Sequence, residues 1–118
     1  MKKIVNTTPH SVRMTDLETG EVYEVPSCGT LINAKPIEEP AGKHTSGAEL
    51  VRVKFTADSQ VEEVLADLER ENPDAIIIGS IIAAQGFPGR VFGLIAAPGF
   101  ERVAPAEKRM RDDKFTTF

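Results

Sequence analysis

The chain has 118 residues, of which 41% are hydrophobic and 27% are charged, and its net charge at pH 7 is −4. These values are typical of one globular domain, so we expect a single domain over residues 1–118. The negative charge argues against a general binder of long nucleic acids, which is usually basic. Cys28 is the only cysteine, which excludes an intrachain disulfide and a cysteine-based zinc site within one chain.

The N-terminal quarter predicts short strands. Residues 2–5 read as a strand and lead into a turn at Pro9, which cannot donate to a strand ladder. Residues 11–16 and 21–25 alternate in polarity and flank a turn that ends at Gly20, so we expect them to form a hairpin. Residues 30–35 predict another short strand.

Residues 36–48 contain two prolines and two glycines among polar residues. This composition predicts a loop, which would be the most mobile interior segment of the chain. Residues 49–56 then alternate cleanly between apolar and polar side chains, which predicts a strand.

Residues 59–71 predict an amphipathic helix. Ser59 and Glu62 have the spacing of a capping box. The apolar residues recur at helical spacing and make one stripe: Val61, Val64, Leu65 and Leu68. The acidic residues opposite this stripe are interpreted as its solvated face.

The last third is very apolar. Residues 75–79 and 90–97 predict two buried strands, and 80–85 predict either a short helix or a continuation of the first strand. Pro105 suits the first position of a final helix over residues 105–114.

The expected fold is therefore α+β, with an antiparallel-rich sheet packed against helices at about 59–71 and 105–114. The two apolar runs of the last third, together with the Phe residues in its turns, supply more apolar surface than two helices cover. We therefore expect a homo-oligomer.

No catalytic or metal signature accompanies this fold. His10 and His44 lack further ligands at metal spacing, and no Ser lies in a nucleophile-elbow pattern. The turn at Gly79 and Ser80 has the context of an anion-binding turn, but one glycine is weak evidence. The sequence thus predicts a binding protein without catalytic residues, metal or cofactor.

The candidate ligand contacts lie in the last third, where Gly/Pro turns carry Phe and Arg. Phe offers a stacking face, and Arg grips phosphate or carboxylate. Arg109 is the strongest single candidate, because the predicted helix would fix its geometry. The basic residues could alternatively pair with Asp112 and Asp113 or complement the helix dipole. The predicted ligand-binding residues are Phe87, Arg90, Phe92, Arg102, Lys108 and Arg109.

The segment 6–12, followed by Asp16, Gly20 and Pro26-Ser27, resembles the start of many small phage and prophage proteins. The segments 79–85, 98–102 and 107–110 resemble, more narrowly, viral sponge proteins of the Thoeris anti-defence type. Those are small oligomeric α+β proteins that sequester cyclic ADP-ribose isomers, and some also hold cyclic oligonucleotides. The resemblance implies that Arg109 grips the pyrophosphate and that Phe87 or Phe92 stacks the adenine.

The resemblance implies an infected or lysogenic bacterial host, and the sequence itself predicts a cytoplasmic protein. No apolar signal segment follows Lys2-Lys3, and the longest apolar run is shorter than the roughly 20 residues of a membrane helix. Two other functions stay open: a structural or protein-interaction component of a phage, and a small hydrolase whose site lies between two subunits with His10 as base.

Overall fold

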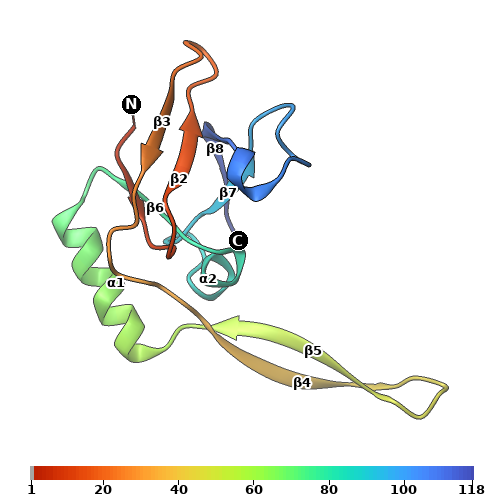
Figure 1. Ribbon diagram of the computed structural model, residues 1–118. Coiled ribbons are helices and arrows are strands. Elements are labelled where there is room, and N and C mark those ends of the chain that lie inside the picture. Colours follow the sequence, from red (N-terminus) through yellow and green to blue (C-terminus); the bar gives the residue numbers. More distant parts are fainter. Residues whose placement is uncertain (1) are drawn as a thin grey trace.

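The computed structural model describes residues 2–118 and confirms the α+β class (Figure 1). Its elements follow in the order β1 (Ile4–Asn6), β2 (Val12–Thr15), β3 (Val22–Val25), β4 (Lys35–Lys43), β5 (Glu49–Thr56), α1 (Ser59–Glu71), β6 (Ile76–Ile78), α2 (Ile81–Gly86), β7 (Gly93–Ala96), the 3₁₀ turn η1 (Pro105–Glu107) and β8 (Met110–Thr116).

The largest sheet has four strands in the order β3-β2-β8-β7. Its first two strands are the predicted hairpin, and their antiparallel register pairs Val12 with Val25. β8 lies in the middle, parallel to β2 and antiparallel to β7. The C-terminal segment therefore joins the first hairpin to the last apolar run.

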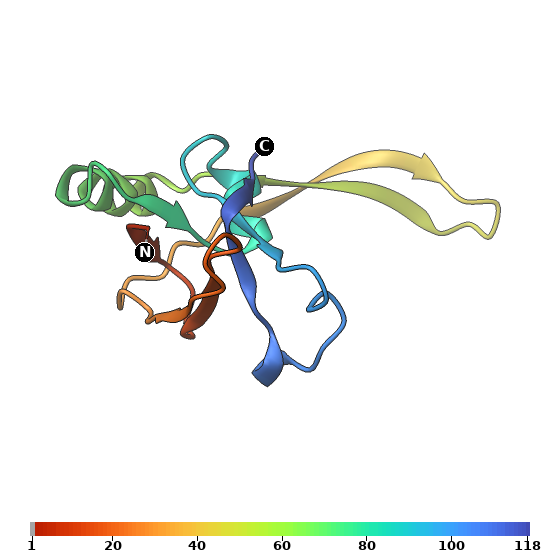
Figure 2. The ribbon, with the colours of Figure 1, turned by 90° about the horizontal axis from the view of Figure 1, so that it is seen from above.

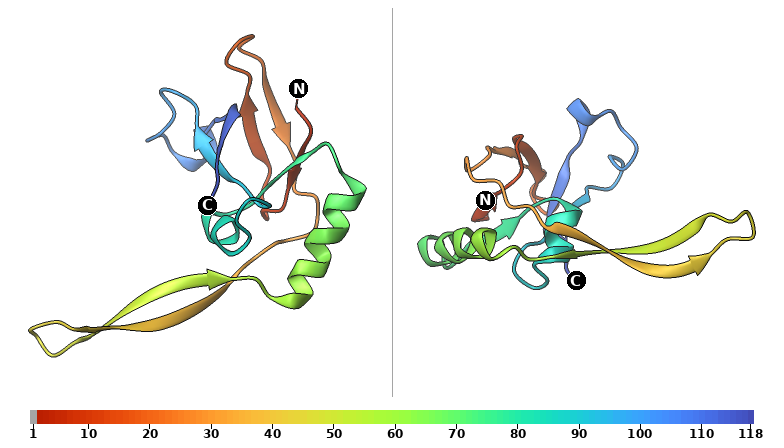
Figure 3. Two further views of the ribbon diagram at one scale, coloured as in Figure 1. Left: turned by 180° about the vertical axis from the view of Figure 1, so that it is seen from behind. Right: turned by 90° about the horizontal axis from the view of Figure 1, so that it is seen from below.

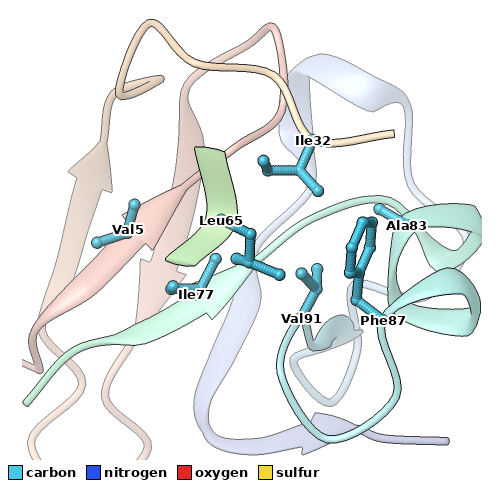
Figure 4. Close-up of a cluster of buried hydrophobic side chains, with 7 residues drawn as sticks. All are labelled: Val5, Ile32, Leu65, Ile77, Ala83, Phe87 and Val91. Carbon is cyan, nitrogen blue, oxygen red and sulfur yellow. The ribbon is translucent and has the colours of Figure 1, made fainter. Parts of the chain in front are cut away.

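A second, parallel pair of strands joins β1 to β6, with Ile4 opposite Ile76. The amphipathic helix α1 packs its apolar stripe against this pair and buries Leu65 completely. Figure 4 shows the resulting core, which also includes Ala83 of α2 and Phe87, the residue after this helix. Its buried members are Val5, Ile32, Leu65, Ile77, Ala83, Phe87 and Val91.

Helix α1 has the predicted bounds but a different cap. Asp58, not Ser59, is the N-cap, and its Oδ1 accepts a hydrogen bond from the Gln60 N–H at 2.9 Å. The predicted capping box of Ser59 and Glu62 is therefore wrong, because the backbone becomes helical one residue earlier. Asn72 ends the helix and donates from its side chain to the Leu68 carbonyl.

The predicted C-terminal helix over residues 105–114 is wrong. Pro105 does begin a helical turn, but this turn covers only three residues. The chain then extends into β8, where Met110 pairs with Met14 on one side and with Ala96 on the other. β8 pairs with β2 on one side and with β7 on the other. These two pairings outweigh the weak helical propensity of the segment.

The predicted mobile loop over residues 36–48 is also wrong over most of its length. β4 occupies Lys35–Lys43 and pairs antiparallel with β5, and only the turn between the two strands remains irregular. Both prolines of the segment fit because β4 has a partner on one side only. The expected strand over residues 30–35 is absent, since regular structure begins only at Lys35.

β4 and β5 project from the rest of the molecule as a long arm, which all views show (Figures 1–3). The radius of gyration is 16.6 Å. A compact chain of this length would have about 13.5 Å. The arm accounts for this elongation and for the longest extent of 54 Å.

Candidate functional site

The six predicted ligand-binding residues do not form one site. Phe87 is the C-cap of α2 and is only 2% exposed, because its ring fills the core between Val91 and Ala83 (Figure 4). A ligand cannot reach this ring without opening the core. The predicted stacking role of Phe87 is therefore wrong.

Arg90 is already paired with carboxylates of α1. Its Nη2 lies 2.6 Å from Glu69 Oε1, and its Nη1 lies 3.2 Å from Glu62 Oε1. The hydrogen bonds to Glu69 raise the pKa of Arg90 further above its ordinary value. These ion pairs connect α1 to the segment before β7. Because two carboxylates surround one guanidinium, the net charge of the site is negative, and Arg90 is poorly placed to bind an anion.

Phe92 shares a cavity of about 170 Å³ with Arg90. Its backbone is fixed by two hydrogen bonds: its N–H donates to Ile77, and its carbonyl accepts from Gly79. Glu69, whose carboxylate pairs with Arg90, also lines this cavity. The structure thus brings together one predicted Arg and one predicted Phe, but in surroundings that repel a phosphate.

The remaining three predicted residues lie in the segment that connects β7 to β8, residues 97–109, here called the basic loop. Arg102 is exposed in this loop. Arg109 stacks on the ring of Phe100, with its guanidinium carbon 4.8 Å from the ring centre. The Nε of Arg109 is buried and has no hydrogen-bond partner within residues 2–118. The ring of Phe100 therefore holds Arg109 in place, while the Nε–H of Arg109 has no acceptor among the described residues.

A cavity of about 240 Å³, here called the loop cavity, lies between the basic loop and the sheet. Two cations, Arg13 and Lys108, border it, and its walls are mostly apolar. Its lining residues are Ser11, Val12, Arg13, Leu94, Pro105, Lys108 and Met110.

Both cations of the loop cavity have only weak partners. Lys108 Nζ donates to the Glu101 carbonyl at 3.2 Å, and Arg13 Nη1 donates to the Ala106 carbonyl at 3.4 Å. The nearest carboxylate to Arg13 is that of Glu24, at 3.8 Å. Within residues 2–118, Lys108 has no carboxylate within 4 Å, and the Glu24 carboxylate lies farther from Arg13 than the Glu69 carboxylate lies from Arg90. Lys108 is therefore the cation most available to an anionic ligand, and Arg13 is the second.

Lys108 and Arg109 lie on different sides of the extended segment that leads into β8. Lys108 and Met110 line the loop cavity, whereas Arg109 between them does not. This alternation follows from the extended backbone of the segment. Arg13 was not among the predicted site residues, because it is distant in sequence and only the parallel pairing of β2 with β8 brings it near Lys108.

The segment around Asn6 is structural. Asn6 is 1% exposed, and its Nδ2 donates to the carbonyls of His10 and Val25 at 2.8 and 3.0 Å. Its Oδ1 accepts from the N–H and the hydroxyl of Thr8. Thr7 Oγ1 donates to the Ile78 carbonyl. These contacts close the turn before β2 and leave His10 exposed at its end.

The turn at Gly79 and Ser80 is also occupied by the fold. A Cβ on Gly79 would lie 2.9 Å from Val91 Cγ1, so the glycine is needed for close packing. Ser80 caps α2, because its Oγ accepts from the Ala83 N–H at 3.1 Å. The glycine thus serves packing and the serine serves as a helix cap.

Within the described chain, no group of three or more His, Cys, Asp or Glu side chains is placed to hold a metal ion. No helix among residues 2–118 is long and apolar enough to cross a membrane. Comparisons with protein-family models, with curated proteins and with solved structures return no match for this chain.

Proposed function

We propose that the protein binds a small cyclic nucleotide and holds it without cleaving it. In this proposal it is a phage-encoded protein of the host cytoplasm that removes an immune signal, such as a cyclic ADP-ribose isomer or a cyclic oligonucleotide. It thereby counters antiviral defence.

The observation that carries the proposal is the loop cavity. Lys108 and Arg13 supply two positive charges at the border of a mostly apolar cavity. This combination suits a ligand that has anionic phosphates and flat apolar rings, because charge-assisted bonds fix the phosphates while the rings bury apolar area. With about 240 Å³, the cavity takes one ring and its phosphate but not a whole dinucleotide.

Arg109 gives secondary support. Its guanidinium rests on Phe100 and has one buried donor without an acceptor. An Arg that an aromatic ring holds in place loses little conformational entropy when it binds a phosphate. We therefore keep Arg109 as a ligand contact, at a second position on the basic loop.

Calorimetry with cyclic ADP-ribose isomers and with cyclic di- and trinucleotides tests the proposal. Replacing Lys108 by Ala should lower affinity at least tenfold, since a charge-assisted hydrogen bond contributes roughly 1.5–3 kcal/mol. Arg102→Ala is the matched control: it removes one positive charge from the same loop, but Arg102 does not line the cavity.

Equal losses in the Lys108→Ala and Arg102→Ala variants would indicate unspecific attraction and contradict a site at the loop cavity. A wild-type protein that binds no member of the panel would contradict the function itself. Recovery of the intact ligand after denaturation separates sequestration from hydrolysis.

A second function has one specific observation in its favour. The exposed arm is typical of proteins that dock onto a partner through a strand, so a structural or protein-interaction component of a phage remains a candidate. Failure of the nucleotide panel would favour this reading.

A further inference from the structure

The arm of β4 and β5 lacks the cover that strands normally have (Figures 1 and 3). It is a sheet of two strands only, and such a ribbon is at best marginally stable in water. Four of its apolar side chains are between 43% and 49% exposed: Ile37, Leu50, Val51 and Val53. The arm thus leaves open surface and backbone that a third strand would cover.

The free edge of β4 is blocked by its sequence. Pro36 lies opposite Phe55, and Pro40 lies opposite Val51. A proline has no N–H, so it fits in a strand where its nitrogen faces away from the neighbouring strand. Both prolines therefore remove donors from the outer edge of β4, and a further strand cannot pair regularly there.

The free edge of β5 is open. Residues directly opposite each other in an antiparallel pair turn their backbone groups the same way, either toward each other or outward. The N–H groups of Val51 and Phe55 therefore point away from β4, as does that of Val53, which lies between them. None of the three donates to a backbone carbonyl outside the hairpin within residues 2–118. Proteins normally protect free edges, and here only one of the two edges is protected.

We infer that β5 pairs antiparallel with β5 of a second copy of this chain. The result is a four-stranded sheet in the order β4-β5-β5-β4 about a twofold axis. Both outer edges of this sheet are the proline-blocked β4 strands, so the assembly closes at two copies. On one face, Val51 and Val53 of both copies become neighbours and cover each other.

The charges of the arm permit this pairing. Residues 35–56 carry four Lys/Arg and three Glu, a net charge of +1, which leaves −5 for the rest of the chain. The two cations of β5 have a carboxylate on their own arm: Lys54 Nζ lies 3.2 Å from Glu39, and Arg52 lies opposite Glu39. Two nearly neutral arms can approach each other although the two bodies repel, and Lys54, which an acidic foreign strand would attract, is already paired with Glu39.

Two proline substitutions at the same residue pair test the inference. Val53 and Glu38 lie opposite each other, so Val53→Pro removes a donor from the open edge and Glu38→Pro removes one from the blocked edge. In light scattering at micromolar concentration, the wild type and Glu38→Pro should have twice the chain mass of 12.8 kDa. Val53→Pro should have the mass of one chain.

If Val53→Pro does not fold, cysteine cross-linking tests the pairing of the two β5 strands instead. In a Cys28→Ser background, single cysteines are placed at Leu50, Arg52 and Lys54 of β5 and at Ile37 of β4. At least one β5 position should form a disulfide-linked dimer. Ile37→Cys should not, because two β4 strands lie about 14 Å apart across three strand spacings of about 4.8 Å, too far for a disulfide.

A monomeric wild type overturns the inference. So does a folded Val53→Pro variant that keeps the dimer mass, because the interface would then lie elsewhere. Cross-links that form equally well from β4 and β5 overturn it too, since they would indicate random collisions. These outcomes do not depend on nucleotide binding, so the pairing of the arms and the proposed function can fail separately.

Discussion

Asn6 has every polar atom of its side chain engaged, and it ties together three parts of the N-terminal region through its contacts to Thr8, His10 and Val25. We expect Asn6→Ala to lower the free energy of unfolding by about 2–4 kcal/mol, because buried backbone groups lose their partners. Urea denaturation measures this change. The control is Asn33→Ala, since Asn33 is exposed; a similar loss in both variants would contradict the role of Asn6.

Tyr23 and Asp112 form a second polar contact, partly buried, between β3 and β8. The Tyr23 hydroxyl donates to Asp112 Oδ2 at 2.6 Å, and Asp112 is 2% exposed. Burial, followed by this hydrogen bond, raises the pKa of Tyr23 from 10.0 to about 12. Since Tyr23 is the only tyrosine and the chain has no Trp, ultraviolet absorbance of the tyrosinate follows this group alone.

The absorbance titration should have its midpoint near pH 12 in the folded protein and near pH 10 in urea. The folded state holds the proton more tightly, so the stabilisation is complete below pH 10 and is lost as the pH rises through 12. Relative to Tyr23→Phe, the wild type should lose up to about 2 kcal/mol over that range, less than the full shift because the ring is partly exposed. A midpoint near 10 in the folded protein would contradict the hydrogen bond between Tyr23 and Asp112.

At the scale of elements, Gly86 sets how closely α2 approaches the base of the arm. A Cβ at this position would lie 2.2 Å from Ala34 Cβ and 3.5 Å from the Thr56 carbonyl oxygen. We expect Gly86→Ala to shift the arm base and to lower the unfolding free energy by about 1–3 kcal/mol, the cost of overpacking. Thermal unfolding measures it against Gln85→Ala, which adds no volume; unchanged stability in Gly86→Ala would show that the two elements separate easily.

Elements with strong local patterns were predictable from the sequence. The hairpin of β2 and β3, the helix α1 and the buried strand β6 lie where alternation, helical spacing or an apolar run placed them. β4 and β8 were missed because their signals are not local. Prolines in β4 suggested a loop, although an edge strand tolerates them, and Pro105 suggested a helix that the sheet replaces after one turn.

At the scale of the whole molecule, the charges are unevenly divided along the chain, and this division explains why the predicted site residues do not lie together. Residues 58–74 hold seven acids and one Arg. Two of these acids, Glu62 and Glu69, form ion pairs with Arg90. The basic loop lies outside the reach of α1 and keeps its cations. Residue type therefore identified the basic candidates, whereas the position of α1 decides which of them remain available.

The sequence by itself determined the α+β class, the bounds of α1 and the first hairpin, because each depends on residues close together in the chain. Only the tertiary structure decided that Phe87 is core, that Arg90 is paired and that Arg13 lies near Lys108, since these depend on contacts between distant segments. Only the tertiary structure also decided that residues 35–43 form a strand of the arm. A strand with two prolines forms only if the prolines lie along the edge without a partner, and local composition does not contain that information.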